Sequence, residues 1–570
     1  MRFASRHSYQ SGVFKSLVRR HSSHMDPSTL GYALISAVAI ALLSVASRRL
    51  GVASPIVLLV AGAALAFAPG APRLVLDPEL VLLVLLPPLL YSSGVGMSWR
   101  GFRTNLRPIL LLAIGCVLFT AAAVAAVAHY AIGTSWAVGF VLGAIVSPPD
   151  AVAPMSVLRA IRLPRRLVTV LEGESLVNDA TALVAFSFAV AAVATGSFSI
   201  GGAAAKFAVV VVGEIAYGIA VGSGALWLRH LSRDPRAEVL LAVATPFVAF
   251  WPPHMLGGSG VVACVSAGLW VSWNGRRLIR PATRLQGYFF WDLIVWAAEA
   301  LVFLLTGLQA RAVVESLASH DWPRALLAGV LVSVTVVLVR FIWVFPATYL
   351  PRLIPAVRRV DPHPDWRMPF LVSFAGLRGV VSMAAALSIP LTLDGKPFPD
   401  RDLVLFATFC VIAVTLIGLG GALPGVVRRL GVERAGAAEA ARNKRDERTV
   451  RLEGIDAVLS AIDRAAQDGA SPGAVATLRR LHAHRRQSLA ATADESTTDD
   501  PVADESALQL RLVDVERNSI ARAYDDKRLT DEARRRIERE MDLEEARIGH
   551  ALASAGSGST DPGNVGSVNR

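Results

Sequence analysis

The sequence predicts an all-α polytopic membrane protein that ends in a polar, helical tail. Of its 570 residues, 53% are hydrophobic, which is too apolar for a soluble chain of this length. The hydrophobic residues gather into runs of about 20 residues, the length that crosses a bilayer as a helix. Charged residues lie mostly between these runs and after residue 428. One membrane domain with a tail therefore explains the length better than several globular domains.

We expect thirteen membrane-spanning helices. Their approximate bounds are residues 29–47, 52–69, 79–98, 108–130, 135–158, 167–193, 204–228, 237–253, 258–274, 286–309, 322–350, 368–391 and 403–425. The eighth and ninth segments are short, and prolines and glycines separate them.

The charges of the loops predict the orientation. If the first span starts outside, the six inner loops hold 20 arginines, whereas the six outer loops with the adjoining span ends hold six arginines and lysines. Positively charged loops stay in the cytoplasm. We therefore expect a multi-pass protein of the cell (plasma) membrane with a cytoplasmic tail.

The sequence divides into three parts. Residues 1–28 form a basic extension that we expect to be disordered, residues 29–427 form the membrane domain, and residues 428–570 form the tail. The extension lacks the apolar core of a signal peptide, and its arginines would lie outside the cell. We therefore hypothesise that translation naturally begins at Met25.

Two segments of the tail, 446–487 and 506–552, have the composition of solvated helices. Residues 488–505 are rich in Ser, Thr, Asp and Ala and predict a linker, and the Gly/Ser-rich residues 554–570 predict disorder. The tail is interpreted either as a helical hairpin without chemistry or as a region for regulation or dimer contact.

The segment Leu171–Asp179 places three carboxylates inside a predicted span. A charge in lipid is costly and by default marks a path or a site for ions. Ser175 and Asp179 are four residues apart, as are Glu174 and Asn178, so each pair shares one face of a helix. One helix can thus offer carboxylate, hydroxyl and amide oxygens to a small cation, and hard cations prefer oxygen ligands.

Two other spans carry a charge beside helix-breaking residues. The fifth span holds Asp150 among three prolines, and the twelfth holds Arg378 between Gly376 and Gly379. Proline breaks helices, and irregular backbone inside a membrane has to line a cavity or be buried in protein. Broken helices in corresponding positions, five and twelve, predict a transport site built from two inverted six-helix repeats.

The buried charges also predict two separate roles, a structural ion pair and a carboxylate that exchanges its counter-ion. An unpaired Arg378 in the membrane would be costly, and Glu174 is its expected partner. This pair leaves Asp179 free to exchange its counter-ion. A proton and a cation then compete for one carboxylate, which is the chemistry of exchange.

Other charged groups in the apolar runs have more than one interpretation. Arg340 could line a cytoplasmic funnel or form a structural pair, and we favour the structural pair. Glu299 and Asp292, seven residues apart, share a helix face and could line an ion entrance or an interface.

Several classes of protein are excluded. The three cysteines lie singly in apolar runs, so they predict neither a disulfide framework nor a metal site. The net charge of +12 does not indicate nucleic-acid binding, because the basic residues lie between the apolar runs and in the tail. No phosphate-binding loop, nucleophile elbow or zinc spacing occurs. We therefore expect no enzyme, no cofactor and no nucleic-acid partner.

Several motifs match a known family. They are Leu85–Tyr91, Pro148–Ala153, Leu163–Leu167, Leu171–Leu183, Phe303–Gln309, Gly376–Gly379 and Ile537–Ala546. With them the chain resembles the monovalent cation:proton antiporter-1 family, and more narrowly its bacterial sodium/proton antiporters. The resemblance covers nearly the whole chain from about Ser28 to Leu552.

The resemblance implies a homodimer of thirteen-span protomers in which a core domain moves like an elevator against a dimerisation domain. It implies exchange of cytoplasmic Na⁺, Li⁺ or K⁺ for external H⁺. By this resemblance Asp179 is the exchange carboxylate, with Asn178 and Asp150 beside it. Ser175 joins Asp179 as a ligand of the transported cation.

Three further expectations follow from the resemblance. It supports the pair of Glu174 with Arg378. Asn178 stands before Asp179 in place of a second Asp, which implies one charge per proton and electroneutral transport. Many relatives carry Thr where this chain has Pro149, so no hydroxyl is offered there and the preference between Na⁺ and K⁺ stays open.

Three other functions compete with a sodium/proton antiporter. The first is a K⁺-selective proton antiporter. The second is a cation channel, but nothing in the sequence resembles a carbonyl-lined selectivity filter. The third is a membrane receptor that signals through its tail, but the tail carries no catalytic motif.

Overall fold

The structure is a computed structural model. It describes residues 27–69, 81–158, 161, 163–196, 200–232, 234–279, 281–317, 322–393, 396–491, 501–526, 528 and 531–556. The predicted extension up to residue 26, the start at Met25, the linker residues 492–500 and the end of the chain from residue 557 lie outside the described residues. The chain forms two compact units, Met1–Glu439 and Ala440–Arg570.

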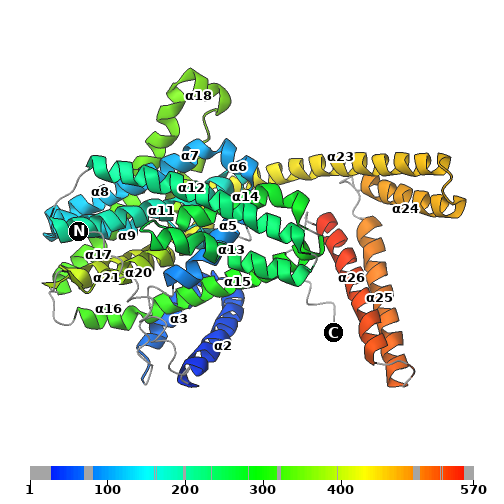
Figure 1. The fold of residues 1–570 in the computed structure, drawn as a ribbon, viewed down its shortest axis with the longest axis horizontal. Coiled ribbons are helices and arrows are strands. Elements are labelled where there is room, and N and C mark those ends of the chain that lie inside the picture. The colour runs from blue at the N-terminus through cyan, green and yellow to red at the C-terminus, as the bar shows by residue number, and fades with distance from the viewer. Residues whose placement is uncertain are drawn as a thin grey trace, which may run out of the picture. The chain divides into compact units, whose positions relative to one another are not determined.

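The first unit is built almost entirely of helices (Figure 1). Its elements are α2 (Pro27–Leu50), α3 (Ser54–Ala66), the π-helical turn η1 (Val81–Leu85), α5 (Leu86–Gly96), α6 (Trp99–Thr104), α7 (Leu106–Leu110), the π-helical turn η2 (Leu111–Cys116), α8 (Val117–Val127), the π-helical turn η3 (Ala128–Ile132), α9 (Trp136–Val146), α10 (Val152–Leu158), α11 (Arg165–Thr195), α12 (Ile200–Leu231), α13 (Pro235–Met255), α14 (Val261–Leu278), α15 (Pro281–Leu308), α16 (Ala310–Ser316), α17 (Trp322–Tyr349), the 3-10 turn η4 (Leu350–Leu353), α18 (Pro355–Val360), α19 (Arg367–Phe374), α20 (Val380–Leu387), the antiparallel strands β1 (Thr392–Leu393) and β2 (Lys396–Pro397), α21 (Arg401–Ala413), the π-helical turn η5 (Val414–Gly420), α22 (Gly421–Leu430) and the start of α23 (Val432–Gln467).

Each of the thirteen predicted spans falls on one helix or on consecutive helices. Within the described residues, six helical segments are long and apolar enough to cross a membrane. They are Leu106–Ile132, Arg165–Thr195, Phe207–Leu231, Gln286–Ser316, Trp322–Leu353 and Arg401–Leu430. Four shorter apolar helices accompany them, namely Ser54–Ala66, Val81–Gly96, Trp136–Val146 and Val261–Gly275. The chain is thus a multi-pass membrane protein, while the total of thirteen spans stays a prediction.

The helices of the first unit pack in two groups. In one group α3 lies against α15, α5 against α14, and α14 against α12. In the other group α9 lies between α8 and α11, and α17 packs on α21. Glycines allow the close contacts: a Cβ atom on Gly62 would collide with the backbone of α15, and one on Gly268 would collide with the backbone of α5. Small residues are the usual means by which helices approach closely in a membrane.

Two segments of non-helical backbone interrupt the second group. The first break, residues 147–151, separates α9 from α10, and the second break, residues 375–379, separates α19 from α20. The two breaks lie against each other, because the backbone N–H of Asp150 donates to the carbonyl of Leu377 at 2.8 Å. Residues 227 positions apart in the sequence are thereby brought together in the middle of the bundle.

Helix α11 passes beside this crossing. It follows Pro164, which precedes the first helical residue, and ends at Gly196, whose φ of 68° lies in the left-handed region. Such a glycine is a common stop signal for a helix. The 31 residues between these signals form one continuous helix, which carries the carboxylates noted in the sequence.

The second unit consists of helices alone within its described residues. They are the remainder of α23, followed by α24 (Pro472–Ala491), α25 (Pro501–Asp525) and α26 (Asp531–Gly556). Helices α25 and α26 run side by side (Figure 1), and Val513, Met541 and Ile548 form the small core between them. Each segment predicted as helical in the tail is thus divided in two. In the predicted segment 446–487, the chain turns at Gly469, which has a φ of 88°, and the next helix, α24, begins at Pro472.

An ionic cluster joins three loops that the charge pattern assigns to the same side. Asp361 accepts hydrogen bonds from Arg107, from Arg166 at 2.7 Å and from Arg352 at 2.7 Å. These arginines precede or follow three different spans. Burial of Asp361 favours its neutral form, but the hydrogen bonds from Arg166 and Arg352 outweigh this and hold its pKa below the usual range. The carboxylate therefore remains charged at neutral pH.

We predict that Asp361→Asn lowers the stability of the membrane domain by about 1–2 kcal/mol, because three arginines lose their shared acceptor. The pKa of Asp361 is lowered in the folded protein, so its contribution is complete above the pKa of about 3.9 found in unfolded chains and disappears as the pH falls through the folded value. Thermal unfolding in detergent should show a difference between wild type and variant that is constant from pH 6 to 9. A difference that grows or shrinks within this range contradicts the assignment.

Candidate functional site

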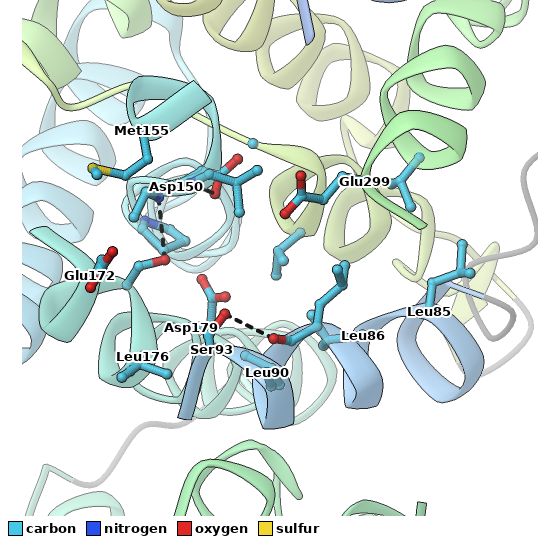
Figure 2. Close-up of a pocket in the computed structure, with 18 of the residues that line it drawn as sticks. Leu85, Leu86, Leu90, Ser93, Asp150, Met155, Glu172, Leu176, Asp179 and Glu299 are labelled. Atoms are coloured by element: carbon cyan, nitrogen blue, oxygen red, sulfur yellow. Dashed lines mark hydrogen bonds between the residues drawn. The ribbon is translucent and has the colours of Figure 1, made fainter. Parts of the chain in front are cut away.

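Asp179 lies in the middle of α11 and faces a cavity of about 310 Å³. Its side chain is buried, with 8% of the residue's surface exposed. Asp150 of the first break and Ser175, one turn earlier on α11, line the same cavity. Figure 2 shows the carboxyl groups of Asp179 and Glu299 facing the cavity from opposite sides. The structure thus brings together three of the residues that the sequence singled out.

The walls of the cavity come from both groups of helices. Helix α11 and the two breaks form one wall, with Asp150, Ser175, Asp179 and Gly379. Helices α5 and α15 form the other wall. This second wall is mainly apolar, apart from Ser93 and Glu299, and the hydroxyl of Ser93 donates to the carbonyl of Leu89 at 2.9 Å. The carboxylates therefore lie at a boundary between the two groups.

Side chains of α11 bind the first break. The amide Nδ2 of Asn178 donates to the carbonyl of Pro149 at 2.5 Å, and the backbone N–H of Ala151 donates to Oγ of Ser175 at 3.3 Å. A break inside a membrane leaves backbone groups without partners. Asn178 and Ser175 provide partners for two of these groups. The predicted role of Asn178 beside Asp179 is therefore partly structural.

Asp150 stabilises the start of α10. Its Oδ1 accepts a hydrogen bond from the backbone N–H of Val152 at 2.8 Å, the arrangement of a capping Asp at a helix N-terminus. Gly379 is needed beside it, since a Cβ atom there would collide with the Asp150 side chain. The second break thus has to contain a glycine where it meets the first.

Arg378 lies where the two breaks meet and is 1% exposed. Its Nε donates to the carbonyl of Val146 at 2.7 Å and its Nη1 to the carbonyl of Gly376 at 2.8 Å. Its backbone N–H donates to the hydroxyl of Thr415 at 3.0 Å. A cation at a helix C-terminus, here the end of α9, is favourable because the free carbonyls point toward it.

The predicted pair of Glu174 with Arg378 is wrong in this structure. Both oxygens of Glu174 accept hydrogen bonds from Arg340 on α17, at 2.6 and 2.8 Å. Arg340 also donates from Nε to the carbonyl of Val372 at 3.1 Å. The guanidinium of Arg378 is committed to backbone carbonyls, so Arg340 is the available partner. The interpretation of Arg340 as a structural residue is confirmed.

Two other acidic residues of the apolar helices lie elsewhere. Glu214 on α12 accepts hydrogen bonds from the backbone N–H groups of Ser259, Gly260 and Val262, at 2.6, 2.9 and 3.1 Å. It therefore closes the N-terminus of α14 and takes no part in the cavity. Asp292 is likewise absent from the cavity lining.

Two residues of the site received no role from the sequence. Glu172 lines the cavity, and its spacing to Ser175 and Asp179, three and seven residues, could have indicated this because it keeps one helix face. Thr415 had no such signal. A single hydroxyl in an apolar span usually bonds to its own helix, and Thr415 does so as well, donating to Val411 at 2.7 Å.

We predict that Glu174→Gln and Arg340→Gln each lower the melting temperature, because breaking a buried ion pair costs about 3–5 kcal/mol. A double-mutant cycle should give a large coupling free energy between positions 174 and 340, and a small one between Glu174 and Arg378. Glu172→Gln, which removes a carboxylate two residues away, is the matched control and should change the melting temperature little. A dominant coupling to Arg378 would contradict the pairing.

The family model described as "sodium/hydrogen exchanger, transmembrane" matches residues 34–429. Over 527 residues the chain is 35% identical to a protein of Mycobacterium tuberculosis described as an uncharacterized Na⁺/H⁺ exchanger, with 90% of this chain and 95% of the relative covered. It is 33% identical to a sodium, potassium, lithium and rubidium/H⁺ antiporter of Bacillus subtilis, over 64% of this chain and 56% of that protein.

A solved structure has the same fold. The sodium/proton antiporter MjNhaP1 of Methanocaldococcus jannaschii matches with a TM-score of 0.58 and 17% identity, over 70% of this chain and 98% of that one. The match of the family model over most of the chain, together with the near full-length relative, identifies the family. The chain belongs to the transmembrane sodium/hydrogen exchangers, a family of cation/proton antiporters.

Proposed function

We propose that the chain exchanges cytoplasmic Na⁺, or Li⁺ or K⁺, for external H⁺ across the plasma membrane, and that Asp179 carries the exchanged ion. The observation that carries the proposal is the cavity in which Asp179, Asp150 and Ser175 meet at the crossing of two helix breaks. Carboxylate and hydroxyl oxygens suit a hard monovalent cation. Ser175 and Asp179 hold the cation, and no covalent bond is made or broken.

The two acids of the cavity have different surroundings, which supports different roles. Asp150 accepts a hydrogen bond from the backbone N–H of Val152 at the start of α10, so its negative charge has a fixed partner. Among the described residues, no hydrogen bond joins Asp179 to a protein group. A carboxylate without a fixed donor has to find its partner among mobile species, a proton or a cation. Competition between the two for Asp179 couples their transport.

We further propose that exchange is electroneutral. Asn178 occupies the position before Asp179, and its amide is engaged with the carbonyl of Pro149. Glu174 is neutralised by Arg340. One proton released from Asp179 for one monovalent cation then leaves the net charge of the site unchanged.

The alternating step is proposed to be an elevator movement. The helices that carry the site, α9 to α11 with α19 to α21, move as a core against the group formed by α3, α5, α12, α14 and α15. The mainly apolar wall from α5 and α15 supports this, since such a surface offers few polar contacts that a sliding core would have to break. The two breaks interrupt the discontinuous helices of two inverted repeats, and the group of α3, α5, α12, α14 and α15 carries a homodimer contact.

The proposed orientation places the tail and the Asp361 cluster in the cytoplasm. Its support is that the cluster joins Arg107, Arg166 and Arg352, which all lie in loops predicted to be inside. Helix α11 then starts at the cytoplasmic face and carries Asp179 about 20 Å from its first residue, at 1.5 Å per residue.

A K⁺-selective exchanger is the second candidate. Pro149 offers no hydroxyl, and its carbonyl is already bound by Asn178, which leaves few fixed oxygens to select a small cation. The relative in Bacillus subtilis, named for sodium, potassium, lithium and rubidium, is consistent with a broad choice of cation.

We predict that Asp179→Asn abolishes cation-dependent proton flux in proteoliposomes, because the amide can neither release a proton nor balance a cation. The assay scans Li⁺, Na⁺ and K⁺ from pH 6 to 9 with a pH-sensitive dye, and the three apparent affinities decide the preferred cation. Ser187→Ala on the same helix, where the hydroxyl donates to Leu183, is the matched control. Proton-coupled flux that persists in a correctly inserted Asp179→Asn variant contradicts the proposal, and flux that does not saturate favours a channel.

We predict that the exchange rate does not respond to membrane potential. Proteoliposomes loaded with K⁺ and treated with valinomycin set potentials of either sign, and Li⁺- or Na⁺-driven proton flux is recorded at each. Equal initial rates support one charge per proton. A rate that rises at one sign and falls at the other means that net charge moves and that Asp150 or another acid also exchanges.

A further inference from the structure

We infer that Glu172 is a cation-attracting residue on the cytoplasmic approach to Asp179, and that it sets the apparent affinity for the cation on that side only. The inference deepens the proposed function and rests on it, because it assumes that Asp179 carries the ion and that α11 starts at the cytoplasmic face.

The register of α11 places Glu172 on the face of the helix that carries the site. Glu172, Ser175 and Asp179 occupy positions i, i+3 and i+7, and all three line the same cavity. Seven residues of helix separate the two carboxylates by roughly 10 Å along the axis. Figure 2 shows Glu172 and Met155 of α10 on the same side of the cavity.

Glu172 lies toward the end of α11 that the arginine cluster holds. Arg166, one and a half turns earlier, is bound to Asp361 together with Arg107 and Arg352. An ion that enters from this end meets Glu172 before it meets Asp179. The surrounding arginines repel cations, so an acid inside the cavity offsets their charge where the cation has to pass.

The environment of Glu172 suits a transient partner. Glu172 is partly exposed, whereas Glu174 is 1% exposed and forms an ion pair with Arg340. Within the described part of the chain, no hydrogen bond or ion pair binds its carboxylate. Neighbouring carboxylates of α11 thus have separate tasks: Glu174 holds the fold, Asp179 exchanges the ion, and Glu172 attracts it.

Glu172→Gln tests the inference in inverted membrane vesicles, whose outer face is the cytoplasmic face. At an effective dielectric constant of about 20, a carboxylate roughly 10 Å from the site attracts a monovalent cation enough to change its affinity roughly tenfold. We expect the KM for Na⁺ added outside to rise roughly tenfold, with kcat changed less than about twofold. The KM for Na⁺ loaded inside the vesicles should stay within about twofold of wild type.

Two controls separate this role from others. The first control is Glu439→Gln. The carboxylate of Glu439 accepts a hydrogen bond from the backbone N–H of Arg165 at 3.3 Å, at the same end of α11, but Glu439 does not line the cavity. This variant should leave both KM values unchanged. Glu172→Asp keeps the charge and should restore most of the affinity. Choline chloride, which is not transported, should reduce the difference between wild type and Glu172→Gln by screening.

The outcomes are distinct from those for the proposed function. If Glu172→Gln leaves the outer KM unchanged, raises both KM values equally or abolishes exchange at saturating Na⁺, the inference is overturned while Asp179 keeps its role. If wild-type protein shows no exchange, or Asp179→Asn retains it, the proposed function itself fails.

Discussion

Two helices break in the middle of an apolar bundle, and their backbone groups need partners that lipid cannot supply. The structure meets this constraint by placing the breaks against each other. Asp150 donates its N–H to Leu377, and the guanidinium of Arg378 binds the carbonyls at the end of α9 and at Gly376. Two further backbone groups of the first break bind side chains of helix α11: the carbonyl of Pro149 accepts from the amide of Asn178, and the N–H of Ala151 donates to the hydroxyl of Ser175. The cavity and its acids exist because this crossing is stable.

The same constraint sorts the charged residues by role. Arg378 is bound to backbone, Glu174 to Arg340, and Glu214 to the N-terminus of α14. Each of these charges has a fixed partner, which is what a buried charge requires in order to be tolerated. Asp179 has no such protein partner among the described residues. The proposed exchange site thus differs from the neighbouring charges because it lacks the compensating partner that each of them has.

The sequence predicted much of this arrangement. Apolar run length indicated the apolar helices, proline and glycine indicated the non-helical segments beside Asp150 and Arg378, and helical spacing placed Ser175 and Asp179 on one face. It could not choose the partner of Glu174. Two buried arginines on different spans satisfy the same charge argument, and only the approach of α17 to α11 makes Arg340 the partner. It also could not find Thr415, whose contact with Arg378 depends on how far η5 lies from the second break.

The hydrogen bond between Asn178 and the Pro149 carbonyl has a consequence for how this exchanger can evolve. Replacing the amide by a carboxylate would add a second exchangeable charge next to Asp179. The same replacement would remove the donor that occupies the carbonyl and place two oxygens against each other. If exchange is electroneutral as proposed, a change of stoichiometry at position 178 therefore also requires a new donor for the carbonyl of Pro149.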